Sequence, residues 1–161
     1  MKTTFLGLAL ILGFSVCGRA QIKAYSAEDI MHRCSSPDTV YIVNFWATWC
    51  IPCVQELPEF NTLASKYADK PVKVLLVSLD FKEDRTYKLQ SFLERKHIAP
   101  EVVWLSETDP NVFIPKIENS WQGSIPATLI LQPGKHLRKF IEGSITAEEV
   151  GAVADGFLSK K

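Results

Sequence analysis

The sequence lacks an excess of charge of either sign, because its 18 Lys and Arg residues are balanced by 18 Asp and Glu residues. A chain with a formal net charge of zero has little electrostatic attraction for a phosphate backbone or an anionic lipid surface. We therefore expect no nucleic-acid partner. The 161 residues, of which 47% are hydrophobic, suit one globular domain with its own core.

The sequence also lacks an apolar run of the roughly 20 residues that a membrane-spanning helix needs. The N-terminal run Phe5–Val16 is shorter and is followed by the small residue Ala20, which is typical of a secretory signal cleaved after that residue. We predict a signal peptide over residues 1–20 and a single domain over residues 21–161. An uncleaved membrane anchor is one alternative, and lipid attachment at Cys17 is another.

The sequence also has few cysteines. Four are too few for the set of disulfides that stabilises a small disulfide-rich protein. Each cysteine must therefore be interpreted from its spacing and surroundings. We expect Cys34 to be a small buried side chain, because free Cys is among the most buried residue types. The alternative, a metal site that includes His32 and Cys34, has no visible third ligand.

Apolar periodicity, caps and turn residues predict an ordered series of elements. The expected helices are Ser26 to about Arg33, about Cys50 to Ala68 with Pro58 inside, a helix through Leu89 and Phe92 to about Lys96, and Thr146 through Phe157. The expected strands are Thr39–Trp46, Val72–Leu79, Val102–Leu105, Ala127–Leu131 and His136–Ile141. A turn is expected at Asp109-Pro110-Asn111.

The order of these elements predicts an α/β fold. A strand, a long helix and a second strand form a parallel βαβ unit. The last two strands are separated only by Gln132–Lys135, which contains Pro and Gly, so these strands should pair antiparallel. We predict a mixed central β-sheet flanked by helices.

Two cysteines, Cys50 and Cys53, lie where the first buried strand gives way to a helix. Unpaired N–H groups and the helix dipole at such a position lower a thiol pKa from about 8.5 to roughly 3.5–7.5. Cys50 should therefore be a nucleophilic thiolate. Cys53, one turn further in and less exposed, should resolve the mixed disulfide that Cys50 forms with a partner. Pro52 suits the first turn of the helix.

Two other interpretations of the pair are an inert structural disulfide and half of a zinc site. A bridge across two intervening residues constrains little of the unfolded chain, so stability is a weak reason for it. A zinc site usually has four ligands, and His97 and His136 stand alone in the sequence. We predict redox chemistry, with neither a bound metal nor a cofactor.

The residues around the pair resemble a known family. The segment NFWATWCIPC at Asn44–Cys53 is similar to the active-site signature of the thioredoxin superfamily, and CVQELP at Cys53–Pro58 resembles its exported TlpA/ResA-like branch. The segment SIPAT at Ser124–Thr128 resembles the family's cis-proline segment. The resemblance extends from about residue 25 to residue 159 and implies a thioredoxin fold.

The same resemblance implies roles for individual residues. Cys50 would be the attacking thiol, Cys53 the resolving thiol, and Pro126 a cis proline packed against the pair. Only about 5–6% of X–Pro bonds in folded proteins are cis, so without the resemblance this bond would be expected to be trans. The backbone of Ile125 would then pair with an extended substrate segment. The predicted substrate-binding residues are Trp49, Ile51, Pro52, Ile125 and Pro126.

Two residues depart from the family pattern, and they limit how far the family's residue roles can be assigned to this chain. Cytosolic thioredoxins have a buried aspartate where this chain has Asn44, which cannot accept a proton. We predict that Glu56 replaces this aspartate. Glu56 follows Cys53 by three residues and so lies on the same helix face. If its carboxyl is partly desolvated and its pKa is raised, it can deprotonate the resolving thiol. A solvated helix glutamate is the alternative. The second departure is Ile51, which stands where glycine is common.

These observations predict an exported, periplasmic thiol-disulfide oxidoreductase that reduces protein disulfides. The resemblance implies apocytochrome c cysteines or another envelope protein as its substrate, and a thiol electron donor in the membrane or envelope. An N-terminal membrane tether is compatible with the sequence. Three alternatives stay open: a thiol oxidase or isomerase that uses the same pair, a non-catalytic copper- or zinc-binding module, and a regulatory or adhesion domain that only kept the fold.

Overall fold

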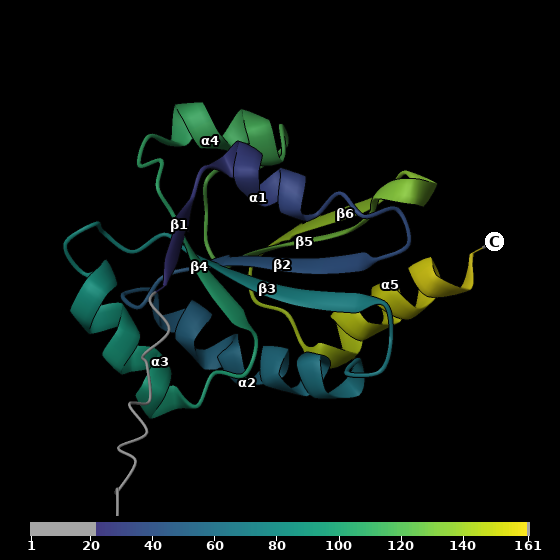
Figure 1. Cartoon of the computed structure of the whole chain (residues 1–161), viewed down its shortest axis with the longest axis horizontal. Helices are drawn as coiled ribbons and strands as arrows, with labels where there is room; N and C mark the ends of the chain where they lie inside the picture. Colours follow the sequence, from purple (N-terminus) through teal and green to yellow (C-terminus); the bar gives the residue numbers. More distant parts are fainter. Residues whose placement is uncertain (1–21, 161) are drawn as a thin grey trace, which may run out of the picture.

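The computed structural model describes residues 22–160, and the predicted signal peptide lies outside them. A single six-stranded sheet, in the order β1-β4-β3-β2-β5-β6, forms the centre of this part of the chain (Figure 1). Its strands are β1 (Lys23–Tyr25), β2 (Val40–Trp46), β3 (Val72–Ser78), β4 (Glu101–Leu105), β5 (Ala127–Gln132) and β6 (Leu137–Glu142). Within residues 22–160, no helix combines the length and apolar character needed to cross a bilayer.

Helical segments connect the strands. The α-helices are α1 (Ala27–Arg33), α2 (Ile51–Lys66), α3 (Gln90–Lys96), α4 (Pro110–Ile117) and α5 (Ala147–Ser159). A π-helical turn, η1 (Arg85–Leu89), leads into α3, and a 3-10 turn, η2 (Pro133–Lys135), joins β5 to β6. The predicted α/β class with a mixed sheet is confirmed: β2, β3, β4 and β1 pair in parallel, and β5 and β6 are antiparallel to their neighbours.

The central strand β2 is buried along all seven residues, as its nearly continuous apolar sequence predicts. Its side chains alternate between two hydrophobic cores, because successive residues of a strand point to opposite faces. Ile42 and Trp46 lie in the core covered by α2 and α5, whereas Val43 and Phe45 lie in the core covered by α1 and α4. Figure 1 shows these helices on opposite faces of the sheet.

Both predicted helix starts with a side-chain cap are confirmed. The Oγ of Ser26 accepts a hydrogen bond from the backbone N–H of Asp29 (3.1 Å), and the Oγ1 of Thr146 accepts one from Glu149 (3.2 Å). In each case the acidic side chain also accepts from the backbone N–H of the capping residue, which completes a capping box. The helix α2 runs through Pro58, as expected.

One predicted turn is wrong. Asp109-Pro110-Asn111 begins α4 instead, where Oδ1 of Asp109 accepts from the backbone N–H of Asn111 (2.9 Å) and Pro110 occupies the first helical position. Asp and Pro favour helix starts as much as turns, so a three-residue window does not separate the two. The edge strand β1, three residues long, was not predicted at all.

The hairpin of β5 and β6 is antiparallel, as the Pro-Gly connection predicts. The connection packs closely on the loop that precedes β2. A Cβ atom added to Gly134 would lie 2.5 Å from the carbonyl oxygen of Pro37. Glycine at this position therefore allows two backbone segments to approach each other.

Candidate active site

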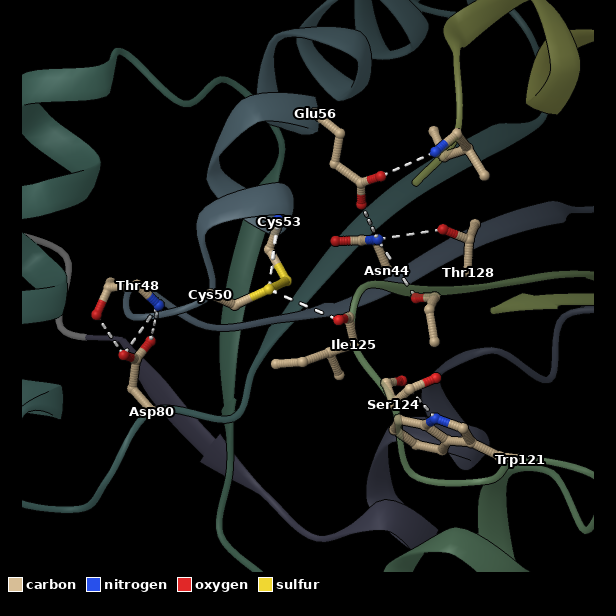
Figure 2. The surroundings of a disulfide bond; sticks show 12 residues. Asn44, Thr48, Cys50, Cys53, Glu56, Asp80, Trp121, Ser124, Ile125 and Thr128 are labelled. Atoms are coloured by element: carbon tan, nitrogen blue, oxygen red, sulfur yellow. Dashed lines mark hydrogen bonds between the residues drawn. A yellow bond between two sulfur atoms is a disulfide. The ribbon is translucent and has the colours of Figure 1, made fainter. Parts of the chain in front are cut away.

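The junction of β2 and α2 holds the cysteine pair. Cys50 is the N-cap of α2, and its Sγ accepts a hydrogen bond from the backbone N–H of Cys53 at 3.3 Å. The two residues form a disulfide with an S–S distance of 2.05 Å (Figure 2). Cys50 keeps 6% of its surface exposed and Cys53 none, which confirms the expected difference in access. Of the two sulfur-bearing residues, only Cys50 keeps part of its surface accessible to solvent.

The predicted cis peptide bond is present between Ile125 and Pro126. The carbonyl oxygen of Ile125 lies 3.7 Å from Sγ of Cys50 (Figure 2). Pro126 is buried, and Ile125 is half-buried at the edge of the site. The loop before β5 and the start of α2 are thus brought together at the disulfide, although they are 75 residues apart in the chain.

The loop that ends in this bond is fixed by Trp121. Its Nε1 donates a hydrogen bond to the carbonyl oxygen of Ser124 (2.8 Å), as Figure 2 shows. The indole ring contacts the rings of Phe45, Phe113 and Phe140, with centroid distances of 4.8–5.7 Å. Tilted aromatic contacts of this kind add to the burial energy. The position of Ile125 is therefore set by a packed aromatic cluster rather than by the loop alone.

The three other predicted substrate-facing residues lie on the surface. Ile51 and Pro52 are exposed at the first turn of α2. Trp49 is 50% exposed and stacks on Phe81, with ring centroids 6.1 Å apart. Several large apolar side chains exposed close together on a surface are typical of a contact site for a partner.

Glu56 lies in the interior, with 4% of its surface exposed, so the alternative of a solvated helix glutamate is excluded. Its Oε1 accepts from Nδ2 of Asn44 (2.9 Å), and its Oε2 accepts from the backbone N–H of Ile145 (3.0 Å). Burial raises the pKa of Glu56 to about 7, and these two hydrogen bonds only partly offset the effect. The carboxyl can therefore hold or release a proton near neutral pH.

Asn44 connects this carboxyl to the sheet. Its Nδ2 also lies within hydrogen-bond distance of the carbonyl oxygen of Ala127 (3.3 Å) and of Oγ1 of Thr128 (3.1 Å) (Figure 2). Its Oδ1 is buried and has no hydrogen-bond partner among the described protein atoms. The amide thus acts as a donor toward Glu56 and toward β5.

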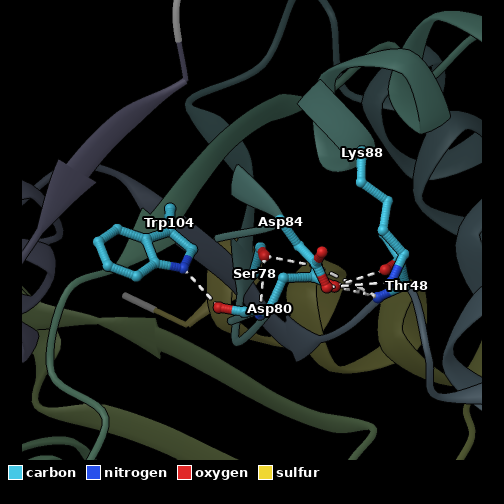
Figure 3. A network of polar contacts seen from close by, with 6 residues as sticks. All are labelled: Thr48, Ser78, Asp80, Asp84, Lys88 and Trp104. Carbon is cyan, nitrogen blue, oxygen red and sulfur yellow. Dashed lines mark hydrogen bonds and ion pairs between the residues drawn. The ribbon is translucent and has the colours of Figure 1, made fainter. Parts of the chain in front are cut away.

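Asp80, which was not among the residues predicted for the site, holds the loop before Cys50. It follows β3, is 2% exposed, and accepts from the backbone N–H of Thr48 (3.0 Å), from the hydroxyl of Thr48 and from the hydroxyl of Ser78 (2.7 Å) (Figure 3). Its carbonyl oxygen accepts from Nε1 of Trp104 (2.6 Å). The signal available in the sequence was a carboxylate directly after a buried strand, at the end where ligands and loops of α/β sheets gather.

Cys34 is a free, buried thiol, as predicted. Burial raises the pKa of Cys34 to about 12, so it stays protonated at neutral pH. Among residues 22–160, no three His, Cys, Asp or Glu side chains are grouped so that they could hold a metal ion. The partner ligands that a site at His32 and Cys34 would need are therefore not supplied by this part of the chain.

The family model that matches the sequence is that of the AhpC/TSA family, over residues 19–140. The chain belongs to this thioredoxin-like family. Among curated proteins, it is 26% identical over 119 residues to the thiol-disulfide oxidoreductase ResA of Oceanobacillus iheyensis, covering 73% of this chain and 55% of ResA. It is 25% identical over 129 residues to the sporulation thiol-disulfide oxidoreductase A of Bacillus subtilis, covering 80% and 73%. The alignment thus spans little more than half of that ResA.

Solved structures share the fold. A thioredoxin-related protein from Neisseria meningitidis serogroup B superposes with a TM-score of 0.66 at 24% identity, covering 78% of this chain and 88% of that one. StoA from Bacillus subtilis superposes with a TM-score of 0.58 at 21% identity, covering 73% and 84%. The thioredoxin fold and the resemblance predicted from the cysteine motif are confirmed.

Proposed function

We propose that this protein is a thiol-disulfide oxidoreductase that reduces disulfides of other proteins through Cys50 and Cys53. The observation that carries the proposal is the disulfide at the start of α2, with the Ile125 carbonyl 3.7 Å from Sγ of Cys50. The relatives named thiol-disulfide oxidoreductases support it. The Cys50 sulfur is the more accessible of the pair and lies beside a backbone acceptor, which suits exchange with an extended chain.

The reaction proceeds in two exchange steps. The Cys50 thiolate, stabilised by the N–H groups at the start of α2, attacks one sulfur of a substrate disulfide and forms a mixed disulfide. The substrate S–S bond breaks, and the first substrate thiolate leaves and takes up a proton. The Cys53 thiolate then attacks Sγ of Cys50 and releases the second substrate thiol. The substrate gains two electrons, and the protein is left with its Cys50–Cys53 disulfide.

Glu56 is the proton acceptor in this scheme. Cys53 is fully buried, so no solvent base can reach its thiol directly. Glu56 follows three residues later on α2, and its pKa of about 7 lets its carboxylate accept a proton at neutral pH. The hydrogen bonds from Asn44 and Ile145 keep the carboxyl oriented. The cycle is complete when a donor dithiol reduces the disulfide and Glu56 returns the proton.

We assign the protein to the exported, periplasmic side of the cell, with residues 1–20 as a cleaved signal or a membrane tether. A disulfide persists in such a compartment. Reduction there needs an upstream thiol electron donor in the membrane or envelope. Cysteines of apocytochrome c or of another envelope protein are the proposed substrates.

The reduction potential tests the proposal. The purified domain would be equilibrated in defined thiol/disulfide buffers while the fluorescence of Trp46 and Trp49, which lie beside the pair, is followed. A value near or below about −230 mV supports a reductant, and a value near about −120 mV supports an oxidant instead. Absence of a reversible couple under conditions where both sulfurs react would overturn the redox function.

A further inference from the structure

The loop that carries Ile125 leads to the cis proline, and the end of β6 is bonded to it. Glu142, the last residue of β6, lies opposite Ala127 in the sheet. Its Oε1 accepts a hydrogen bond from the backbone N–H of Gln122 (2.8 Å), and its Oε2 accepts one from the hydroxyl of Ser124. One side chain thus holds the loop at two residues, which are 20 and 18 positions away in the chain.

A glycine turns the chain between these two donors. Gly123 has a φ of +88°, in the left-handed region that favours glycine. The hydroxyl of Ser124 and the backbone N–H of Gln122 hold the pKa of Glu142 below its usual range, so its carboxylate is charged at neutral pH. Hydrogen bonds to an ionised acceptor are roughly twice as strong as those between neutral groups. The attachment of the loop to β6 is therefore charge-assisted.

Ser124 is held at two of its atoms by two different parts of the fold. Its carbonyl oxygen accepts from Nε1 of Trp121 (2.8 Å, Figure 2), whereas its hydroxyl donates to Glu142. A single hydrogen bond leaves a residue free to turn about the point of attachment, and a second one removes that freedom. Because Ser124 directly precedes Ile125, its orientation sets the direction in which the Ile125 backbone continues.

The end of β6 also holds the residue that follows Ile125. The carbonyl oxygen of Pro126 accepts from the backbone N–H of Gly143 (2.8 Å), which comes directly after Glu142. Between these attachments, the Ile125 carbonyl oxygen lies 3.7 Å from Sγ of Cys50. An extended substrate bonded to Cys50 would bring its backbone N–H groups to this carbonyl. The direction of the carbonyl matters, because hydrogen bonds weaken steeply when they are bent.

We propose that Glu142 is a positioning residue for the exchange reaction, which orients the Ile125 carbonyl for hydrogen bonding to the substrate backbone. The proposal rests on the proposed exchange function and adds to it a residue outside the cysteine motif. The exchange steps are unchanged: the substrate disulfide takes up two electrons and two protons to give two thiols, and Cys50 and Cys53, which supply them, form their disulfide. Loss of the Glu142 carboxylate should weaken substrate binding and leave the exchange between sulfur atoms as it is.

The test compares three disulfides that differ in their backbone. The first is the disulfide-linked dimer of a five-residue peptide with one central cysteine and Ser elsewhere. The second is the same dimer, methylated on the backbone nitrogens of the cysteine and its two neighbours, so that these nitrogens carry no hydrogen. The third, 2-hydroxyethyl disulfide, has no peptide bond. Reduced protein is mixed with each at rising concentration. The half-saturating concentration measures binding, and the limiting rate measures the exchange of sulfur atoms.

The unmodified protein should bind the unmethylated peptide about fivefold more tightly than the methylated one, as expected for one hydrogen bond. In Glu142→Ala, this binding ratio should fall to within about twofold of one. The limiting rate and the reaction with 2-hydroxyethyl disulfide should stay within about twofold of those of the unmodified protein. Ser124→Ala should lower the ratio in the same way, because Glu142 acts on Ile125 through Ser124. This second variant keeps the test decisive if Glu142→Ala does not fold.

Glu118→Ala is the matched control. The carboxylate of Glu118 also accepts from a serine hydroxyl and a backbone N–H, both of Ser120 (2.8 and 3.2 Å), and it pairs with Arg138 (2.8 Å). These partners of its carboxylate lie outside residues 122–126. Glu118→Ala therefore removes hydrogen bonds of the same kind without releasing the loop at Ser124, and the binding ratio should stay as in the unmodified protein.

Three results would overturn the proposal. They are equal binding of the two peptides by the unmodified protein, a binding ratio that survives either Glu142→Ala or Ser124→Ala, and an equal loss of rate with all three disulfides in Glu142→Ala. If the unmodified protein reduces the three disulfides and one of these results is found, only the role of Glu142 is excluded. If it reduces none of them, the exchange function itself fails.

Discussion

Nδ2 of Asn44 lies 2.9 Å from Oε1 of Glu56, so a side chain of the central strand donates to a buried carboxyl of α2. The other oxygen of Glu56 accepts from the backbone N–H of Ile145, just before α5. One carboxyl thus joins three separate parts of the domain close to the disulfide. Its protonation should therefore affect the stability of the fold, and in the proposed mechanism it also accepts the proton of Cys53.

Stability should depend on pH through Glu56. Its pKa is raised by burial from 4.5 to about 7, so the folded chain holds this proton more tightly than the unfolded chain does. The resulting stabilisation, about 3 kcal/mol, is complete below about pH 4.5 and is lost as the pH rises through about 7. Urea unfolding of the unmodified protein and of Glu56→Gln at pH 4.5 and 7.5 measures this difference.

The two proteins should differ in their pH response by about 3 kcal/mol, since the amide introduced by Glu56→Gln does not titrate. Glu83→Gln, at an exposed carboxyl, is the matched control and should follow the unmodified protein. Parallel pH profiles for Glu56→Gln and the unmodified protein would contradict the raised pKa.

Replacement of the buried sulfur should trap the reaction half-way. In Cys53→Ser, the Cys50 thiolate still attacks a disulfide, but no second thiol releases the mixed disulfide. We expect a stable covalent adduct with a disulfide-bonded peptide, detectable by mass spectrometry without reducing agent. Cys50→Ser should give no adduct, because Cys53 is fully buried. Equal adduct formation by both variants would mean that the two sulfurs are equally accessible.

Asp80→Asn should destabilise the fold by about 1–3 kcal/mol. The hydroxyl and the backbone N–H of Thr48 and the hydroxyl of Ser78 all donate to the Asp80 carboxylate, and an amide would place N–H groups where these donors need acceptors. The matched control is Asp84→Asn. Asp84 forms an ion pair with Lys88 at 3.0 Å on the surface (Figure 3), and such a pair contributes about 0.3–0.5 kcal/mol. Urea unfolding of both variants measures the loss in unfolding free energy. Similar losses would show that the hydrogen bonds of Asp80 stabilise the fold no more than the surface pair of Asp84 and Lys88 does.

Two glycines should respond to alanine in opposite directions. Gly134→Ala would place a Cβ 2.5 Å from the Pro37 carbonyl oxygen, so one backbone segment must move and the melting temperature should fall. Gly156 lies within α5, and a Cβ there would meet no atom within 4 Å. Gly156→Ala should therefore stabilise the protein by about 0.4–1 kcal/mol. Thermal unfolding distinguishes the two, and a rise for Gly134→Ala would exclude the close contact.

Local signals in the sequence were sufficient to predict most helices and strands of the fold. The capping boxes at Ser26 and Thr146 each act within four residues, and the apolar run of β2 is visible in the sequence itself. Asp109 and Pro110 were misassigned because the same residue types begin helices and form turns. β1 has only three residues and depends on pairing with β4, some 80 positions away, so it leaves almost no local pattern.

By itself, the sequence determined the cysteine spacing, the buried strand before it and the helix after it, because each of these depends on neighbouring residues. Only the tertiary structure decided that Glu56 is buried against Asn44, that Asp80 holds the loop at Thr48, and that Glu142 holds the loop before the cis proline. These contacts join residues that are 12 or more positions apart, and desolvation, hydrogen bonding and packing between such residues exist only once the chain has folded.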